Sequence, residues 1–200
     1  MHSQPLCYDS WYGTCWILPP NRHLVFDKNW RCMEENIQVN DFVNFSKSLI
    51  DNKGITDQSL SEVAQALSKL SKIEDLFKFG QYRGRGANAA ESYVLYEDSE
   101  PGGPVLQLAR FDGPTAIHNH GSWGALCGYI RDQYYSQWVL QAEDHSKVVQ
   151  TIDIIIKPGD FVYWPDVPND IHKQVPVDND VWVIIYMGRN AFDIPRIVYD

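Results

Sequence analysis

The spacing of apolar residues changes along this chain, and its first regular stretch is helical. Phe42, Phe45 and Leu49 recur at intervals of three and four residues, which places them on one face of an α-helix. Asp41 stands just before this run, where its side chain can cap the first turn, and Gly54 follows the last apolar position. The pattern predicts a helix from Asp41 to about Gly54.

A second helical stretch follows directly. The segment from Ser59 to Glu62 has the spacing of a capping box, so we expect a helix that begins at Ser59 and runs to about Gly80. Its apolar side chains form a stripe, and we expect the two stripes to pack the helices as a pair against the rest of the protein. The positions that follow the 3.6-residue period are Leu60, Val63, Leu67 and Leu70.

From residue 93 onward the pattern changes to short apolar runs separated by Gly, Pro and Asp. Such runs predict β-strands, and a series of them predicts an antiparallel barrel or sandwich. The predicted strands are 93–96, 105–111, 123–130, 134–140, 148–156, 161–164 and 181–187.

The order of these segments predicts one domain with a helical appendage. We expect residues 1–82 to form an N-terminal arm and helices, and residues 83–200 to form the β-barrel on which they pack. Residues 1–40 are aromatic-rich and contain a Pro-Pro break, so we expect an irregular arm that wraps over the core.

The composition changes the picture by excluding some partners. The chain has 26 acidic and 17 basic residues, a formal charge of −9 and no dense Lys/Arg block, which argues against nucleic acid and anionic membranes as partners. We see no secretory signal and no apolar run long enough to cross a bilayer. The four cysteines form no CxxC pair, so we expect a reducing, cytoplasmic location, with Cys127 as a buried, inert thiol.

Three histidines are candidate metal ligands. His118 and His120 are one residue apart in a segment with strand character, so we expect both imidazoles on one face. His172 follows on another apolar run, after a turn at Pro158–Asp160. Three imidazoles from two strands can hold one divalent metal and leave other coordination positions open, as catalytic sites do. The ligand set admits Fe, Zn, Ni, Cu or Mn.

The spacing of these residues resembles the first motif of the cupin superfamily, which supplies metal ligands from such strands. Gly113, His118 and His120 match that motif, although the gap after the glycine is one residue short. The family motif continues with a glutamate, whereas this chain has Gly124 and Ala125 in that place.

A second motif and the order of the elements extend the resemblance. His172 stands in the second cupin motif, two residues further from Pro165 than usual. The resemblance implies a mainly β fold, a double-stranded β-helix barrel of the cupin type with an N-terminal α-helical region.

Cupins with three histidines and no carboxylate include the thiol dioxygenases, that is, cysteine dioxygenase and 3-mercaptopropionate dioxygenase. The stretch 118–124 looks like the bacterial branch of this group, and 157–160 and 170–172 look like its second motif. The resemblance covers roughly residues 40–190. It implies a mononuclear non-haem Fe(II) dioxygenase that uses O2 to oxidise a small chelating substrate, a thiol, to a sulfinate.

The chain departs from that group on its last long strand. The group carries a Ser-x-His-x-Tyr stretch beside the iron, and Val183, Ile185 and Met187 occupy those positions here. We expect these apolar residues to line the substrate pocket. Tyr186 falls on the other face of the strand unless the alignment shifts by one residue, and it is kept as a candidate catalytic residue.

Other candidate site residues follow from their place near the presumed barrel mouth. Cysteine dioxygenase binds the substrate carboxylate with an arginine on an early strand, and residues 91–95 contain none. Tyr163 and Arg110 are candidate catalytic residues. Candidate replacements for the missing arginine are Arg110, Arg131 and Arg189. Aromatic residues that either line the pocket or fill the core are Trp123, Tyr134 and Trp164.

The sequence therefore predicts an iron-dependent dioxygenase, with three alternatives. One is a divergent cupin metalloenzyme of secondary metabolism that acts on a substrate other than a thiol. Another is an O2-independent metal-dependent isomerase, lyase or hydrolase. The third is a binding module without turnover. Neither the substrate nor the oligomeric state follows from the sequence.

Overall fold

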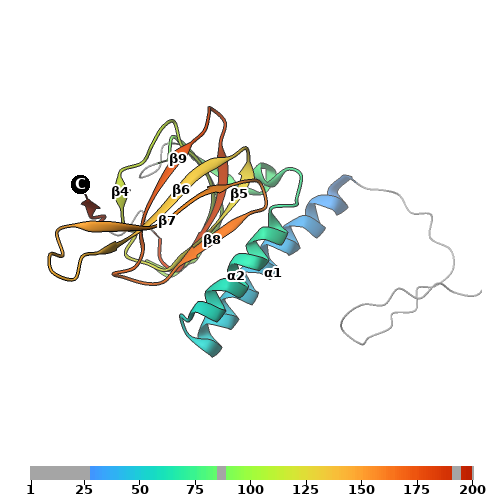
Figure 1. Ribbon diagram of the computed structural model, residues 1–200. Coiled ribbons are helices and arrows are strands. Elements are labelled where there is room, and N and C mark those ends of the chain that lie inside the picture. The colour runs from blue at the N-terminus through green and yellow to red at the C-terminus, as the bar shows by residue number, and fades with distance from the viewer. Residues whose placement is uncertain (1–27, 85–88, 191–194, 200) are drawn as a thin grey trace, which may run out of the picture.

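The structure, a computed structural model, describes residues 28–84, 89–190 and 195–199, with side chains from Gln38 onward. Two α-helices lie side by side against one of two facing β-sheets (Figure 1). The helices are α1 (Lys28–Lys53), α2 (Asp57–Leu70) and the short 3-10 helix η1 (Leu76–Phe79). The strands are β1 (Gln81–Gly84), β2 (Glu91–Glu97), β3 (Val105–Arg110), β4 (Ile117–His118), β5 (Gly124–Ile130), β6 (Gln133–Leu140), β7 (Val148–Ile156), β8 (Phe161–Trp164), β9 (Ile171–Pro176), β10 (Trp182–Met187) and β11 (Val198–Tyr199).

The strand pairing is that of a double-stranded β-helix. One sheet has the order β1-β2-β3-β10-β5-β8 and the other β11-β4-β9-β6-β7. The antiparallel pairs β6–β7, β5–β8, β4–β9 and β3–β10 are nested, as they would be in one long hairpin wound into two facing sheets. The mainly β fold predicted from the sequence, with helices at its N-terminal side, is confirmed.

Strand alternation divides the apolar side chains of the first sheet between two cores. The outer core lies between this sheet and the helices and includes Leu106, Leu108, Ile184 and Tyr186, with Phe42, Leu60, Val63 and Leu67 from α1 and α2. The inner core lies between the two sheets and includes Val105, Ala109, Leu126, Tyr135, Val162, Trp164, Val183, Ile185 and Met187. The face of the strand on which a residue lies therefore decides whether its side chain packs in the barrel interior or against the helices.

The first helix begins earlier than the sequence pattern indicated. α1 starts at Lys28, so Asp41 lies inside the helix and does not cap it, and residues 28–40 are helical where an irregular arm was expected. The physical reason is that residues 28–40 contain no Gly or Pro to stop the helix, and an exposed Asp in a helix costs only a fraction of a kcal/mol. The rest of the predicted arm, residues 1–27, lies outside the described residues.

The second helix is capped by Thr56 and not by Ser59. The Thr56 hydroxyl accepts a hydrogen bond from the Ser59 backbone N–H (3.1 Å), and the Thr56 N–H donates to the Ser59 hydroxyl (2.9 Å). Ser59 is thus the third helical residue of a capping box, the position usually taken by Glu or Gln. The pair Ser59 and Glu62 has the same spacing as Thr56 and Ser59, so the predicted helix start was three residues too late.

The same helix ends at Leu70, about ten residues before the predicted end. The following segment is held by the Tyr129 hydroxyl of β5, which accepts from the Leu76 N–H (2.9 Å) and contacts the Ile73 carbonyl (3.0 Å). These backbone groups gain partners from a distant strand, a tertiary effect that no local pattern contains.

The seven predicted strands are all present, with ends shifted by a few residues. β1 and β11 were not predicted, because they are short, and β4 and β9 were expected only as the strand segments that carry His118 and His172. None of the described helices is long and apolar enough to span a membrane. The division of the chain after residue 82 stays a prediction.

Candidate metal centre

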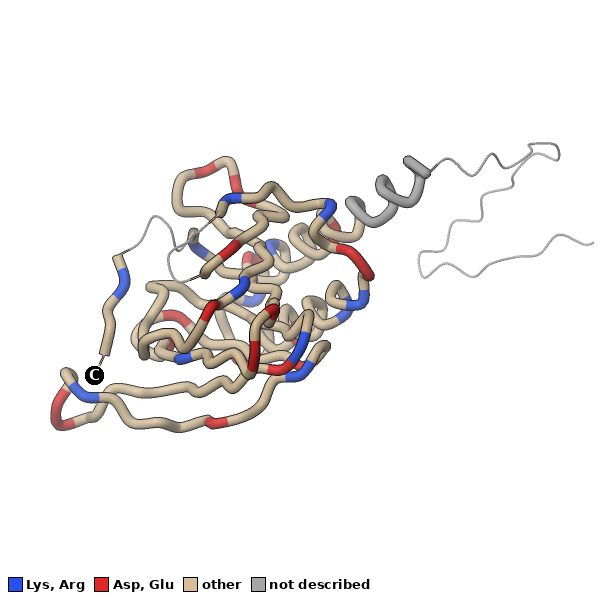
Figure 2. Tube along the Cα trace, turned by 90° about the horizontal axis from the view of Figure 1, so that it is seen from above, with Lys and Arg blue, Asp and Glu red and all other residues tan. Residues whose placement is uncertain are grey.

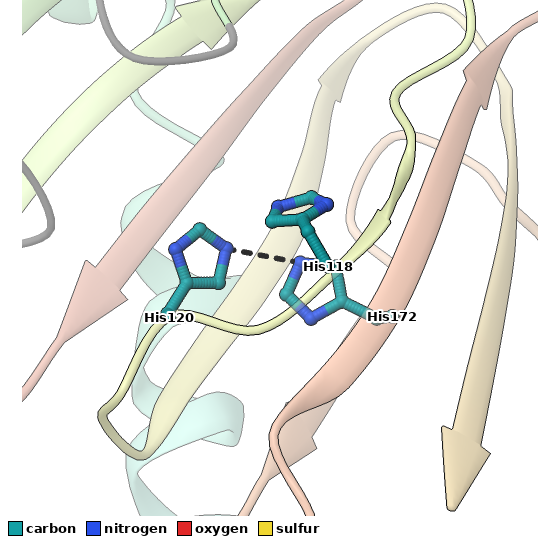
Figure 3. Close-up of side chains that lie close together, drawn as sticks. All are labelled: His118, His120 and His172. Atoms are coloured by element: carbon teal, nitrogen blue, oxygen red, sulfur yellow. Dashed lines mark hydrogen bonds between the residues drawn. The ribbon is translucent and has the colours of Figure 1, made fainter. Parts of the chain in front are cut away.

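Two segments far apart in sequence bring the three histidines together. β4 and β9 pair through one residue pair, His118 opposite His172. His120 was expected on the same strand as His118, but β4 ends at His118 and His120 lies in the loop that follows. Figure 3 shows the three rings pointing toward one another from these segments.

A buried carboxylate fixes the loop that carries His120. Asp170 Oδ2, just before β9, accepts hydrogen bonds from the backbone N–H groups of His120 (2.9 Å) and Gly121 (2.6 Å). Gly121 has a φ of 66°, a left-handed conformation that favours glycine. The chain therefore turns sharply after His120. The two hydrogen bonds to Asp170 hold the loop so that the His120 ring lies beside the rings of His118 and His172.

The donor atoms are close enough to share one ion. One ring nitrogen from each histidine lies within 4.8 Å of those of the other two, and the Nε2 atoms of His120 and His172 are 3.1 Å apart. Two nitrogens that each bind one ion at about 2.0–2.1 Å, with a right angle at the ion, lie about 3 Å apart. The separation of the His120 and His172 Nε2 atoms therefore fits two ligands of one ion. Among the described residues, this group contains no carboxylate and no thiolate.

Hydrogen bonding and burial prepare the rings as neutral donors. His118 Nδ1 lies 2.9 Å from the Ala116 carbonyl and must donate to it, which leaves the Nε2 lone pair for a ligand. Burial lowers the pKa of His118 to about 4 and the pKa values of His120 and His172 well below the usual range. The buried Nδ1 atoms of His120 and His172 have no hydrogen-bond partner. These properties fit a divalent metal.

Aromatic rings enclose the histidines on the barrel side. The Trp164 ring stacks on His120, with 5.9 Å between centroids and 24° between planes, and Tyr135 stacks on His172 at 5.6 Å. Trp164 is fully buried and its indole N–H donates to the Ser122 carbonyl (3.0 Å). A Cβ on Gly124 would lie 2.3 Å from the Trp164 ring, so the absence of a side chain there lets the indole reach the site.

A cationic side chain also acts on this group. The positive charge of Arg196 contributes, after burial, to lowering the pKa of each of the three histidines. Its segment is tied to the ligand loop, because the Ile197 N–H donates to Asn119 Oδ1 (2.8 Å) and the Asn119 N–H to the Ile197 carbonyl (3.2 Å). Burial lowers the pKa of Arg196 to about 10, which still leaves it charged at pH 7.

The structure separates the predicted pocket residues into two groups. Val183, Ile185 and Met187 face the barrel interior together with Trp164, on the side of the histidines. Their role as pocket residues stays a prediction.

The remaining candidates point away from the histidines. Trp123 and Tyr186 belong to the outer core, where Tyr186 packs edge-on against Phe42 (5.1 Å). Tyr163 donates to Asp57 of α2 (2.9 Å), and Tyr134 is 48% exposed. The physical reason is the twofold strand period, which turns these side chains to the opposite face from their inward neighbours.

The candidate arginines are outside the group of histidines, although the Arg189 guanidinium donates to the Gly121 carbonyl of the His120 loop (3.3 Å). Arg110 forms ion pairs with Glu91 (3.4 Å) and Asp112 (3.1 Å) at the end of β3. Arg131 and Arg189 are more than half exposed and pair with Asp178 and Asp166.

Sequence reasoning missed Tyr135 and Arg196, and it noted Asp170 only as part of the second motif, without a role. Tyr135 could have been found from the strand period, because it alternates with Tyr134. Asp170 directly precedes the His172 strand, but its role depends on a backbone contact across the fold. Arg196 carries no local signal, since it follows the last long strand. Cys127 is free and buried in the outer core, as expected, and burial raises its thiol pKa to about 11.

Comparisons with known proteins add structural likenesses only. No protein-family model and no curated protein matches the chain. Hydroquinone 1,2-dioxygenase PnpCD, solved with Cd2+ and 4-hydroxybenzonitrile, aligns with a TM-score of 0.43 at 9% identity, over 64% of this chain and 78% of its own.

Two further solved structures show likenesses of similar size. A deletion mutant of Bacillus subtilis oxalate decarboxylase gives a TM-score of 0.42 at 10% identity, over 61% of this chain but only 30% of its own. A structure from work on the DMSP lyases RdDddP and RnDddQII gives 0.41 at 11% identity, over 72% and 71%. None of the three is a thiol dioxygenase, and that part of the resemblance stays a prediction.

The buried histidines predict how the stability of the metal-free protein depends on pH. The pKa of His118 is lower in the folded state (about 4) than its ordinary 6.5, so the unfolded chain binds the proton first as pH falls. Stability is therefore complete above pH 6.5 and decreases toward pH 4, by roughly 3 kcal/mol for this residue alone. Urea unfolding of chelator-treated protein at a series of pH values measures this. His118→Gln should show a shallower slope, and equal slopes would contradict the assignment.

Proposed function

We propose that His118, His120 and His172 bind Fe(II) and that the protein is a mononuclear non-haem dioxygenase acting on a small, anionic, chelating substrate. The observation that carries the proposal is the convergence of three buried, neutral imidazoles within 4.8 Å, with no carboxylate among them in the described chain. A bound Fe(II) supplies a place where substrate and O2 can meet.

The charge of the site favours an anionic substrate. Neutral imidazoles leave the full charge of a divalent ion uncompensated, and Arg196 adds a further positive charge nearby. A buried excess of positive charge is costly unless an anion enters with the ligand. Asp170 lies nearby, but its Oδ2 is engaged by two backbone N–H groups. A carboxylate or thiolate substrate would supply the missing charge.

The side chains around the histidines have separate tasks in this proposal. Val183, Ile185 and Met187 exclude water from the inner side, and Trp164 and Tyr135 hold two of the rings in place. Arg196 attracts and orients the anionic end of the substrate. In the thiol version of the reaction, both atoms of O2 add to the sulfur and R–S⁻ becomes R–SO2⁻, so the reaction needs no external reductant.

Metal content is the first test of the proposal. Protein purified without added metal should contain about one iron per chain, and His172→Ala should lose it because the remaining two imidazoles hold the ion weakly. His145→Ala is the matched control, because His145 is exposed in the β6–β7 loop and should keep the metal. Elemental analysis measures the metal content of the three proteins. A wild-type protein that contains no metal, and binds none on incubation with Fe(II), would contradict the proposed metal site.

Oxygen consumption is the second test. The Fe(II) protein should take up O2 with cysteine or 3-mercaptopropionate and form the sulfinate, measured with an oxygen electrode and mass spectrometry. The Zn(II)-loaded protein should consume none. If neither thiol supports uptake by the iron protein, the thiol version is wrong, and turnover without O2 would point to Lewis-acid chemistry instead.

The role of Arg196 is testable with a matched pair of substrates. Arg196→Gln should raise KM for 3-mercaptopropionate by about 10-fold or more, since a charge-assisted hydrogen bond contributes roughly 1.5–3 kcal/mol. KM for the uncharged 3-mercaptopropionamide should change little. Arg131→Gln is the control, since Arg131 is more than half exposed and pairs with Asp178 (2.7 Å). An equal effect on both substrates would remove Arg196 from substrate binding.

A further inference from the structure

Three glutamines inside the barrel have amide atoms without a partner. Gln107, Gln133 and Gln174 are only 7%, 0% and 1% exposed. The Oε1 atoms of all three, and the Nε2 atom of Gln133, make no hydrogen bond within the described chain. Buried amide groups without a partner cost free energy and are few in native proteins, so each one needs a reason. A ligand that enters the barrel would supply the missing partner.

Strand alternation turns all three side chains toward the barrel interior. Gln107 stands on β3 between two residues of the inner core. Gln174 follows His172 by two residues on β9, so it shares the face of that histidine, and it lies opposite Tyr135 of β6. Gln133 precedes Tyr135 by two residues on the same strand. The three amides therefore belong to the interior that also holds the histidines.

The register places Gln107 and Gln174 one inward residue beyond the histidines, toward the same end of the barrel. Trp164, whose ring packs on the histidines, is level with Val105 through the pairs that join β8, β5, β10 and β3, and Gln107 is the next inward residue. From there β3 leads across to the second sheet, where the backbone of Thr115 pairs with Gln174. The offset from the level of the histidines is two residues, or about 6.6 Å, along each strand.

The interior is not completely filled beside Gln107. Its inward neighbours on the two adjoining strands are Val94 of β2 and Ile185 of β10. These two residues keep 8% and 4% of their surface exposed, and Gln107 keeps 7%. The inward residues before and after Gln107 on β3, Val105 and Ala109, keep 0% and 1%. Accessible space therefore reaches the interior at the level of Gln107, where a ligand group can contact its amide.

The strand residues around Gln107 and Gln174 carry no charge. β5, β6, β8 and β10 contain no charged residue, and Figure 2 shows long stretches of strand without one. The inward residues that pair with the two glutamines are aliphatic or aromatic, namely Val94, Ile185 and Tyr135. A charged group would be buried there without a counter-charge. An uncharged group that both donates and accepts hydrogen bonds would satisfy the amides.

We propose that Gln107 and Gln174 form a subsite for an uncharged polar group, a carboxamide or a hydroxyl, at the end of the substrate remote from the metal. The inference rests on the proposed function, which places the chelating end of the substrate at the three histidines. The offset of about 6.6 Å suits a small substrate, in which one or two carbon atoms separate the polar group from the carbon that carries the chelating atoms. An apolar group of the same size is disfavoured, because it leaves both amides buried and unpaired.

Two ligands of the same shape test the subsite. They are the analogues of asparagine and leucine in which a thiol replaces the amino group, so that the chelating ends are identical and the other ends are a carboxamide and an isopropyl group. Because zinc has no redox chemistry, calorimetry with the Zn(II)-loaded protein measures binding without oxidation. We expect the carboxamide compound to bind about tenfold more tightly or better, since it pairs amides that the isopropyl compound leaves unpaired.

Substitution of each glutamine by methionine, a residue of similar length, tests the assignment. Gln107→Met and Gln174→Met should each reduce the preference toward unity by weakening the binding of the carboxamide compound, with little change for the isopropyl compound. Gln133→Met is the matched control and should keep the preference, because Gln133 is as deeply buried but lies two residues further from the histidines. Circular dichroism checks the folding of each variant, and either of the first two is sufficient for the test.

The outcomes separate this subsite from the proposed reaction. Equal affinity of the unchanged protein for both compounds overturns the subsite and leaves the metal site and the dioxygenase proposal standing. A preference that survives both substitutions, or that Gln133→Met abolishes as well, gives the amides a purely structural role and also overturns it. A zinc protein that binds neither compound contradicts the subsite and the chelating substrate together. A carboxamide preference in a protein whose iron form consumes no O2 supports the subsite and contradicts the dioxygenase alone.

Discussion

Burial of three imidazoles in one pocket is the constraint on which this structure depends. Such rings can share a pocket only if they are uncharged, and the low pKa values of the histidines show that the fold enforces this state. Each neighbouring feature serves the arrangement. Asp170 binds the backbone beside His120, the Ala116 carbonyl selects the tautomer of His118, and Gly124 makes room for the tryptophan that packs on the rings.

The double-stranded β-helix provides this pocket by using the two faces of each strand for different purposes. On β10, Ile184 and Tyr186 hold the helices while Val183, Ile185 and Met187 form the inner wall. The helices thus stabilise the outer face of the sheet without approaching the histidines. The chemistry of the inner face can therefore change from one protein to another while the helical packing is kept.

The sequence was sufficient for features with a local period and insufficient for those made by distant contacts. Strand alternation and motif spacing identified the histidines and put Val183, Ile185 and Met187 on one face. For Trp123, Tyr134 and Tyr163 the prediction was less certain. The twofold period of a strand indicates that neighbouring side chains lie on opposite faces, but which face is turned to the barrel interior depends on how the two sheets pack. The helix that ends at Leu70 and the approach of Arg196 are fixed by segments more than fifty residues away.

The pairing of β4 has a mechanical consequence. It meets β9 through a single residue pair, and β11 joins β4 through two, so few backbone hydrogen bonds fasten this corner of the sheet. A cation bound by rings from both sides would act as a cross-link between β4 and β9. Removing the ion would then release β11 and Arg196 as well, so that amide exchange in these segments reports occupancy directly.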